Sequence, residues 1–128
     1  MEESKKIKIM IVDDDKFLLD MYSRKFSQSN YEVNVCIGSD DCLEKLKSGF
    51  VPDILVLDLI MPKMDGISLF KEIQKLKLSP KSKNIILTNQ GQQSDLDKVK
   101  DLGIDGYIIK ALYTPTEVVE KIKEIFNK

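Results

Sequence analysis

The chain has 128 residues, of which 42% are hydrophobic, and this fits one domain with a single packed core. Twenty basic residues against 21 acidic ones leave a formal charge of −1, which argues against a general binder of nucleic acid or anionic membranes. No histidine is present, so catalytic triads and histidine general bases are excluded.

The amino terminus is short: residues 2–6 are polar and lead directly into a strand-like segment. It holds no apolar run that could act as a signal peptide or a membrane span, so we expect a cytoplasmic protein without membrane contact. Cys36 and Cys42 do not form a CxxC pair, and no histidine could complete a zinc site with them. We expect both thiols to be reduced and mostly buried.

Strand-like and helix-like segments alternate five times along the chain. The predicted strands are residues 7–12, 31–36, 53–57, 84–88 and 107–110, and the predicted helices are residues 16–28, 39–48, 66–76, 94–102 and 115–126. Ser39 and Gly49 are expected to flank the second helix as its start and stop signals. Alternation of this kind is typical of an α/β fold, with a parallel sheet covered by helices on both faces.

Two strands differ in a way that predicts their places in the sheet. Residues 54–57 are continuously apolar, which is typical of a central strand buried on both faces, whereas residues 31–35 alternate apolar with polar, as an edge strand does. This favours a flavodoxin-like (βα)5 sandwich with the strand order 2-1-3-4-5. In such sheets, ligands bind beyond the carboxyl ends of the strands, at the switch point between strands 1 and 3.

Polar residues stand at the carboxyl ends of four of these strands. Asp13 and Asp14 follow the first, Asp58 follows the third, Thr88 ends the fourth and Lys110 ends the fifth. Parallel strands would bring them to one edge, where close carboxylates repel each other by on the order of a few kcal/mol per pair. Such a cluster needs a proton or a cation, and a few hard oxygen ligands suit Mg²⁺. The sequence therefore predicts a magnesium site.

This arrangement favours phosphoryl transfer to an aspartate. Mg²⁺ would gather and neutralise phosphate oxygens, and Asp58 would be the nucleophile that forms an acyl phosphate. Lys110 would make a charge-assisted contact to the phosphoryl group, and to Asp58 before transfer. The hydroxyl of Thr88 could donate to another phosphoryl oxygen.

Four stretches of the sequence carry a family resemblance: IVDDD at 11–15, DLIMPKMDG at 58–66, IILT at 85–88 and GIDGYIIK at 103–110. With these motifs the chain resembles, over essentially its whole length, the response-regulator receiver domains of bacterial two-component signalling. The resemblance implies that residues 1–128 form one receiver domain that acts in phosphorelay signal transduction.

The resemblance implies a role for each matching residue. Asp58 corresponds to the phosphoacceptor, which receives its phosphoryl group from a phosphohistidine on a sensor histidine kinase or a phosphotransfer protein. Asp13 and Asp14 correspond to the acidic pair that holds Mg²⁺, and the backbone carbonyl of Ile60 to a further metal ligand beside Asp58. Lys110 corresponds to the active-site lysine. Such a domain catalyses its own phosphorylation and dephosphorylation but is not a metabolic enzyme.

The resemblance also implies a switch and its partners. Thr88 and Tyr107 correspond to the switch pair, in which the threonine moves toward the phosphoryl group and the aromatic ring turns inward. The movement would remodel the face made by the last two helices and the last strand, where a downstream effector or a second copy would bind; no direct contact with nucleic acid is expected. Asp15, Leu18 and Met21 correspond to the region that docks the histidine donor.

The chain departs from the family pattern near the site. Ala111 stands where the family has a proline joined by a cis bond; a cis bond here would cost about 3 kcal/mol, so we expect a trans bond and a shifted loop. Asn89 replaces a small residue and is expected to narrow access to the phosphoryl group. Neither Ile60 nor Gln90 carries a carboxylate that could activate water, which predicts a long-lived phosphoaspartate.

The sequence bears on three other functions. A receiver-like adaptor that acts by protein binding without phosphorylation is compatible with Asn89 and Ala111. A haloacid-dehalogenase-type phosphatase needs a second aspartate two residues after the nucleophile, where this chain has Ile60. A flavodoxin-like FMN carrier needs a glycine- and hydroxyl-rich phosphate loop, whereas the carboxylates of residues 13–15 would repel a phosphate.

Overall fold

The computed structural model describes residues 6–89 and 93–128, with strands and helices in alternation. The strands are β1 (Ile7–Asp13), β2 (Tyr31–Ile37), β3 (Ile54–Leu57), β4 (Lys83–Thr88) and β5 (Gly106–Ile109), and the helices are α1 (Lys16–Gln28), α2 (Ser39–Lys47), α3 (Gly66–Lys75), α4 (Gln93–Lys100) and α5 (Pro115–Phe126). In the described part of the chain, no helix is both long and apolar enough to cross a membrane.

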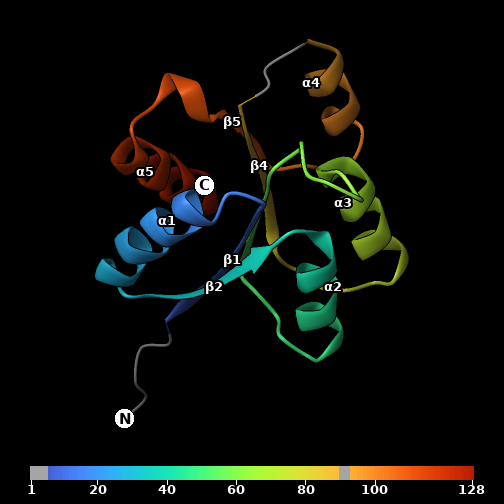
Figure 1. Cartoon of the computed structure of the whole chain (residues 1–128), viewed down its shortest axis with the longest axis horizontal. Helices are drawn as coiled ribbons and strands as arrows, with labels where there is room; N and C mark the ends of the chain where they lie inside the picture. Colours follow the sequence, from blue (N-terminus) through green and yellow to red (C-terminus); the bar gives the residue numbers. More distant parts are fainter. Residues whose placement is uncertain (1–5, 90–92) are drawn as a thin grey trace.

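The five strands form one parallel sheet in the order β2-β1-β3-β4-β5, as the sequence predicts. Helices α1 and α5 cover one face, and α2, α3 and α4 cover the other (Figure 1). The register pairs Val12 with Leu57, and Thr88 with Ile109. The residues at the carboxyl ends of these strands therefore reach the same edge of the sheet.

Each face of the sheet has its own apolar core. In β1, Ile9 and Ile11 belong to the core under α1 and α5, whereas Met10 and Val12 belong to the core under α2, α3 and α4. The alternation of side chains along a strand explains why the central strands are apolar without interruption. Cys36 lies in the second core with Cys42, and both are buried free thiols, as expected.

The structure corrects several predicted boundaries. Helices α2 and α3 each end one residue earlier than expected, and α4 begins at Gln93 and ends at Lys100. Strand β5 ends at Ile109, so that Lys110 begins a short 3₁₀ turn instead of ending the strand. No described peptide bond is cis, which confirms the expected trans bond after Lys110.

The prediction that Ser39 caps α2 is wrong. The cap residue is Gly38, whose φ of +89° lies in the left-handed region that favours glycine. Ser39 is the first residue of the helix, and its hydroxyl donates to the carbonyl oxygen of Met64 instead of accepting from an amide of its own helix, as the hydroxyl of a cap residue does.

Candidate functional site

Three carboxylates meet at the carboxyl edge of the sheet. Asp13 is the last residue of β1, Asp14 follows it, and Asp58 follows β3. Each side chain offers a carboxylate oxygen, and these three oxygens lie within 4.8 Å of one another. Asp13 and Asp58 are only 2% and 6% exposed, whereas Asp14 faces solvent. The two inner carboxylates are therefore held away from water, with a third at the opening.

Lys110 supplies the positive charge in this cluster. Its ammonium lies 2.6 Å from Asp13 Oδ2 and 3.4 Å from Asp58 Oδ2, and its side chain is buried. Burial alone would lower the pKa of Lys110, but the hydrogen bond to Asp13 and the charges of Asp58 and Asp13 together raise it. The lysine therefore stays protonated and divides one charge between two carboxylates.

The surroundings of Asp58 act on its pKa in opposite directions. Burial raises its pKa to about 6; the ammonium of Lys110 opposes this rise, and the charge of Asp13 adds to it. The hydroxyl of Thr88 donates to Asp58, and the Ile60 amide donates to its Oδ1 at 3.4 Å. Asp58 is thus ionised above about pH 6 while it stays poorly compensated.

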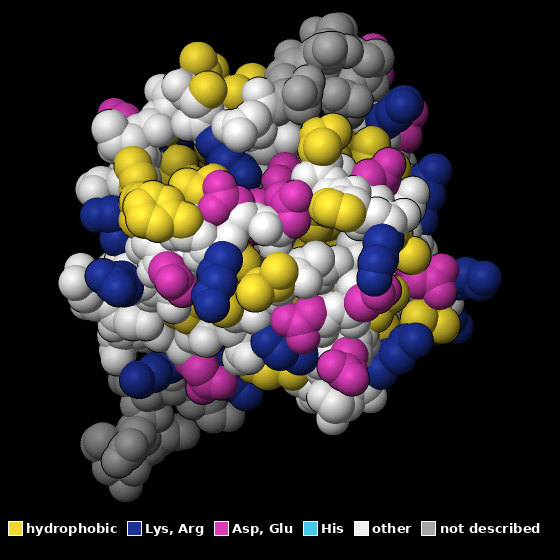
Figure 2. Space-filling view, in the orientation of Figure 1, with side chains coloured by type: hydrophobic (Ala, Val, Ile, Leu, Met, Phe, Trp, Pro, Cys, Tyr) yellow, Lys and Arg dark blue, Asp and Glu magenta, His cyan; other side chains and the backbone are white. Residues whose placement is uncertain are grey.

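The site opens to solvent through a small cavity. Its volume is about 250 Å³, and it is lined by Asp13, Asp14, Asp15, Leu18, Asp58, Ile60, Thr88, Asn89 and Lys110. Acidic side chains gather near the middle of this face, with hydrophobic side chains beside them (Figure 2). The space suits a phosphoryl-sized group better than a large organic ligand. Asn89 lines the cavity and is exposed, and Gln90 lies outside the described residues.

The donor set fits a hard divalent cation. The three carboxylates are oxygen ligands, and the cluster contains neither histidine nor cysteine, so it suits Mg²⁺ better than Zn²⁺. Two inner carboxylates share one ammonium, which leaves the negative charge of the cluster in excess. The residues therefore fit the cation that the sequence predicts.

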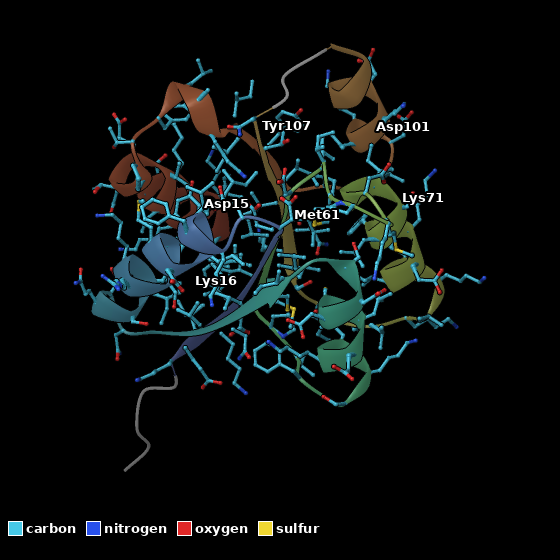
Figure 3. The ribbon with its side chains drawn as sticks, viewed as in Figure 1. Asp15, Lys16, Met61, Lys71, Asp101 and Tyr107 are labelled. Atoms are coloured by element: carbon cyan, nitrogen blue, oxygen red, sulfur yellow. The ribbon has the colours of Figure 1, made fainter. Side chains whose placement is uncertain are left out.

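The structure brings six of the seven predicted site residues to this cavity: Asp13, Asp14, Asp58, Ile60, Thr88 and Lys110. Tyr107 does not line it. This residue is half-buried on β5, contacts the core under α2, α3 and α4, and borders a separate depression between β5 and α5. In Figure 3, Tyr107 lies away from Asp15 and Met61, which mark the loops around the site.

Two features of the site escaped sequence reasoning. Tyr22 is buried on α1, and its ring hydroxyl is close enough to Lys110 and Asp13 to interact with their charges. It stands seven residues after Asp15, the cap of α1, and therefore two turns along the same helix face, which was an available signal. The hydrogen bond of Ser39 to Met64 spans 25 residues, and no local pattern predicts it.

Comparison with known proteins agrees with this geometry. The family model described as the response regulator receiver domain matches residues 9–123. The chain is 29% identical to the transcriptional regulatory protein ResD of Bacillus subtilis, over 100% of this chain and 51% of ResD. It is 32% identical to the chemotaxis protein CheY of Thermotoga maritima, over 92% of this chain and 96% of CheY. The chain thus spans about half of ResD and nearly all of CheY.

A solved structure shows the same architecture. The CheY-like receiver domain protein of Methanospirillum hungatei superposes with a TM-score of 0.85 at 29% identity, over 96% of this chain and 95% of that one. The similarity therefore extends over the whole sheet and its covering helices.

Proposed function

The chain belongs to the family of response regulator receiver domains, and we propose that it accepts a phosphoryl group on Asp58 in a Mg²⁺-dependent step of a phosphorelay. The observation that carries this proposal is the position of Asp58 beside Lys110 and two further carboxylates, at the floor of a small open cavity. We assign residues 1–128 to this one domain, which acts as a signalling module and not as a metabolic enzyme.

Asp58 is the nucleophile of the proposed step. With a pKa of about 6, its carboxylate is mostly ionised near pH 7.5, and its burial leaves it weakly solvated and reactive. The carboxylate forms an Oδ–P bond while the P–N bond of a phosphohistidine breaks. The imidazole, protonated on its other nitrogen, leaves as a neutral ring. Because the chain has no histidine, the phosphohistidine would lie on another protein, a sensor histidine kinase or a phosphotransfer protein.

Lys110 and Thr88 hold the reacting groups. Before transfer, the ammonium of Lys110 keeps Asp13 and Asp58 together, and after transfer it makes a charge-assisted contact to a phosphoryl oxygen. The hydroxyl of Thr88 donates to the carboxylate of Asp58 in the unphosphorylated protein. Once Asp58 carries the phosphoryl group, the same hydroxyl would donate to a phosphoryl oxygen.

Asp13, Asp14, Asp58 and the Ile60 carbonyl would hold the cation. When bound, Mg²⁺ neutralises the oxygens of the incoming phosphoryl group. Asp14 would offer its carboxylate from the solvent side of the cluster, and the buried Asp13 is oriented by Lys110.

The surface around the cavity suits a protein donor. Ile60 lines the cavity and is exposed, and Phe17 at the start of α1 and Leu112 in the 3₁₀ turn after β5 are exposed as well. Of the residues predicted to dock the donor, Asp15 is exposed and caps α1, whereas Leu18 is half-buried and lines the cavity. Exposed apolar side chains close to a charged site would become buried against a protein partner.

The output of the domain would pass through the α4-β5-α5 face. A depression of about 410 Å³ lies between β5 and α5 there, bordered by Tyr107. We propose that movement of Thr88 toward the phosphoryl group lets the ring of Tyr107 turn inward, which changes this face for an effector or a second copy.

We propose that the phosphoaspartate is long-lived. Ile60 is 58% exposed at the opening, and its apolar side chain cannot activate water, while Asn89 narrows the entrance. A hydrolysis half-life of seconds after labelling would contradict this part of the proposal.

The test is labelling with acetyl phosphate and Mg²⁺, read by intact mass, and with beryllofluoride, read by NMR shifts. The parent should gain the mass of one phosphoryl group, and Asp58→Asn should gain none. Asp53→Asn, which changes an aspartate at the other end of the sheet, is the matched control and should label like the parent. A parent that neither gains mass nor shifts would favour the adaptor that is never phosphorylated.

A further inference from the structure

Two adjacent residues at the start of α2 connect both loops of the site. The amide of Gly38 donates to the carbonyl oxygen of Asp13 at 3.1 Å. The hydroxyl of Ser39, which is 3% exposed, donates to the carbonyl oxygen of Met64 at 2.7 Å. One dipeptide therefore joins the end of β1, with its acidic residues, to the loop between β3 and α3. We call this pair of contacts the Gly38–Ser39 bridge.

The β3–α3 loop, residues 59–65, is held at its base by its own backbone. The amide of Gly66 donates to the carbonyl of Leu59 at 2.9 Å, which closes the loop where α3 begins. Its tip lies farther out, where Lys63 has a φ of +69° and faces solvent. The ion pair of Lys63 with Asp40 is 3.7 Å long and exposed, so it restrains the tip only weakly. The hydrogen bond from Ser39 is shorter and less exposed, so it is the stronger restraint.

This loop carries Ile60, on which the proposed metal site depends. The Ile60 amide donates to Asp58, and its carbonyl is the expected backbone ligand of the cation. Two of the acids that would share the cation, Asp13 and Asp14, stand at and just after the end of β1, whereas the third, Asp58, follows β3. Because ligand geometry depends on residues that hold the ligands in place, the distance between the two loops matters for affinity.

We propose that Ser39 is a positioning residue for the metal site, acting through Met64 to hold the two loops at the spacing that Mg²⁺ needs. The inference rests on the proposed function, because it assigns the cation to Asp13, Asp14 and Asp58. A hydroxyl that only stabilised the start of α2 would affect unfolding, but it would leave metal affinity unchanged.

The experiment compares Ser39→Ala with Ser48→Ala in the full chain. Ser48 is the matched control because its hydroxyl also donates to a carbonyl, that of Lys45 at 2.8 Å, but at the far end of the same helix. MgCl₂ is titrated into unphosphorylated protein by calorimetry, and amide hydrogen exchange of the β3–α3 loop is followed in EDTA. Ser39→Cys, whose thiol is a weaker donor, is measured alongside.

We expect Ser39→Ala to raise the Kd for Mg²⁺ roughly three- to tenfold, the effect of one lost hydrogen bond. Exchange of the loop amides should be faster in EDTA, the labelling rate at saturating Mg²⁺ should stay within about twofold of the parent, and Ser39→Cys should be intermediate. Ser48→Ala should bind Mg²⁺ like the parent. If Ser39→Ala does not fold, the Kd and loop exchange of Ser39→Cys decide.

The other outcomes overturn either the role of Ser39 alone or both that role and the proposed function. A parent that binds Mg²⁺ and is labelled, with an unchanged Kd in Ser39→Ala, overturns the bridge and leaves the proposed function standing. An equal loss of affinity in Ser48→Ala also overturns the bridge, because the effect then belongs to the helix in general. A parent that neither binds Mg²⁺ nor is labelled overturns both.

Discussion

Aspartates stand at both ends of the sheet, but their surroundings differ. At the amino end, Asp53 precedes β3 and Asp105 precedes β5; at the carboxyl end, Asp13 ends β1 and Asp58 follows β3. The first pair is exposed and the second is buried. The same side chain therefore has a different task at each end.

The aspartates at the amino end each join two neighbouring strands. Asp53 accepts from the amide of Lys8 at 2.8 Å, and its own amide donates to the Lys8 carbonyl at 2.7 Å. Asp105 repeats this arrangement with Asn84, at 2.7 Å and 2.8 Å. Each carboxylate has a backbone donor and contact with water, so the local fold explains these residues fully.

At the carboxyl end, Asp13 and Asp58 also accept from backbone amides, those of Asp15 and Ile60, but they have almost no contact with water. Asp13 and Asp58 are buried beside a third carboxylate, and one ammonium serves both. Charges that are buried without full compensation cost stability, so packing alone does not account for this cluster. The balance of charge and burial therefore distinguishes the aspartates of the proposed site from the structural ones, whereas position at a strand end does not. Three predictions test it.

The largest effect is expected for Lys110→Met, which keeps the stem of the side chain but removes its charge. Asp13 and Asp58 would then face each other without a positive charge between them, so the free energy of unfolding in EDTA should fall by about 3 kcal/mol at pH 8. Because Lys110 lowers the pKa of Asp58, its loss favours protonation of that carboxyl, and the deficit should shrink at pH 5. Urea unfolding at the two pH values measures both. A variant as stable as the parent at pH 8 would show that the lysine compensates nothing.

The next effect is expected for Asp58→Asn without metal. The pKa of Asp58 is raised to about 6, so the folded state binds more protons than the unfolded state between about pH 4 and pH 6, and parent stability falls as pH rises through this window. The asparagine of the variant does not titrate, so the stability of the variant does not fall in this way. It should therefore match the parent near pH 4 and exceed it by on the order of 2 kcal/mol above pH 7 in urea unfolding.

Magnesium supplies the control for this second prediction. Bound to the carboxylates, the cation should stabilise the parent more than Asp58→Asn, and the difference in stability should therefore narrow or reverse. If the free energy of unfolding of the variant exceeds that of the parent by the same amount from pH 4 to pH 8, burial does not raise the pKa of Asp58.

The sequence predicts the carboxyl end well because its signals are local. Asp13, Asp58 and Thr88 stand next to apolar strands, and parallel strands place such residues at one edge. The order of the strands follows from which segments are apolar on both faces. These signals need no knowledge of contacts between distant segments.

What the sequence does not predict depends on contacts between distant segments. Ser39 has the residue type of a helix cap, but Gly38 turns the chain one residue earlier and leaves the serine free to reach Met64, 25 residues away. Lys110 was expected to end a strand, yet the 3₁₀ turn that it begins brings its ammonium to Asp13. Propensity describes a residue and its neighbours, whereas these contacts arise when separate β/α units pack together.

The smallest effect is expected at the amino end. Asp105→Ala should lower the free energy of unfolding by about 1 kcal/mol, because the amide of Asn84 loses its acceptor but remains open to water. Asp105→Asn keeps an oxygen acceptor and should lose less in the same urea unfolding. Neither change should alter the Kd for Mg²⁺, because both lie at the edge of the sheet opposite the carboxylate cluster. A weaker Mg²⁺ affinity in Asp105→Ala would mean that the two ends are coupled through the sheet. The aspartates at the two ends would then not have separate roles.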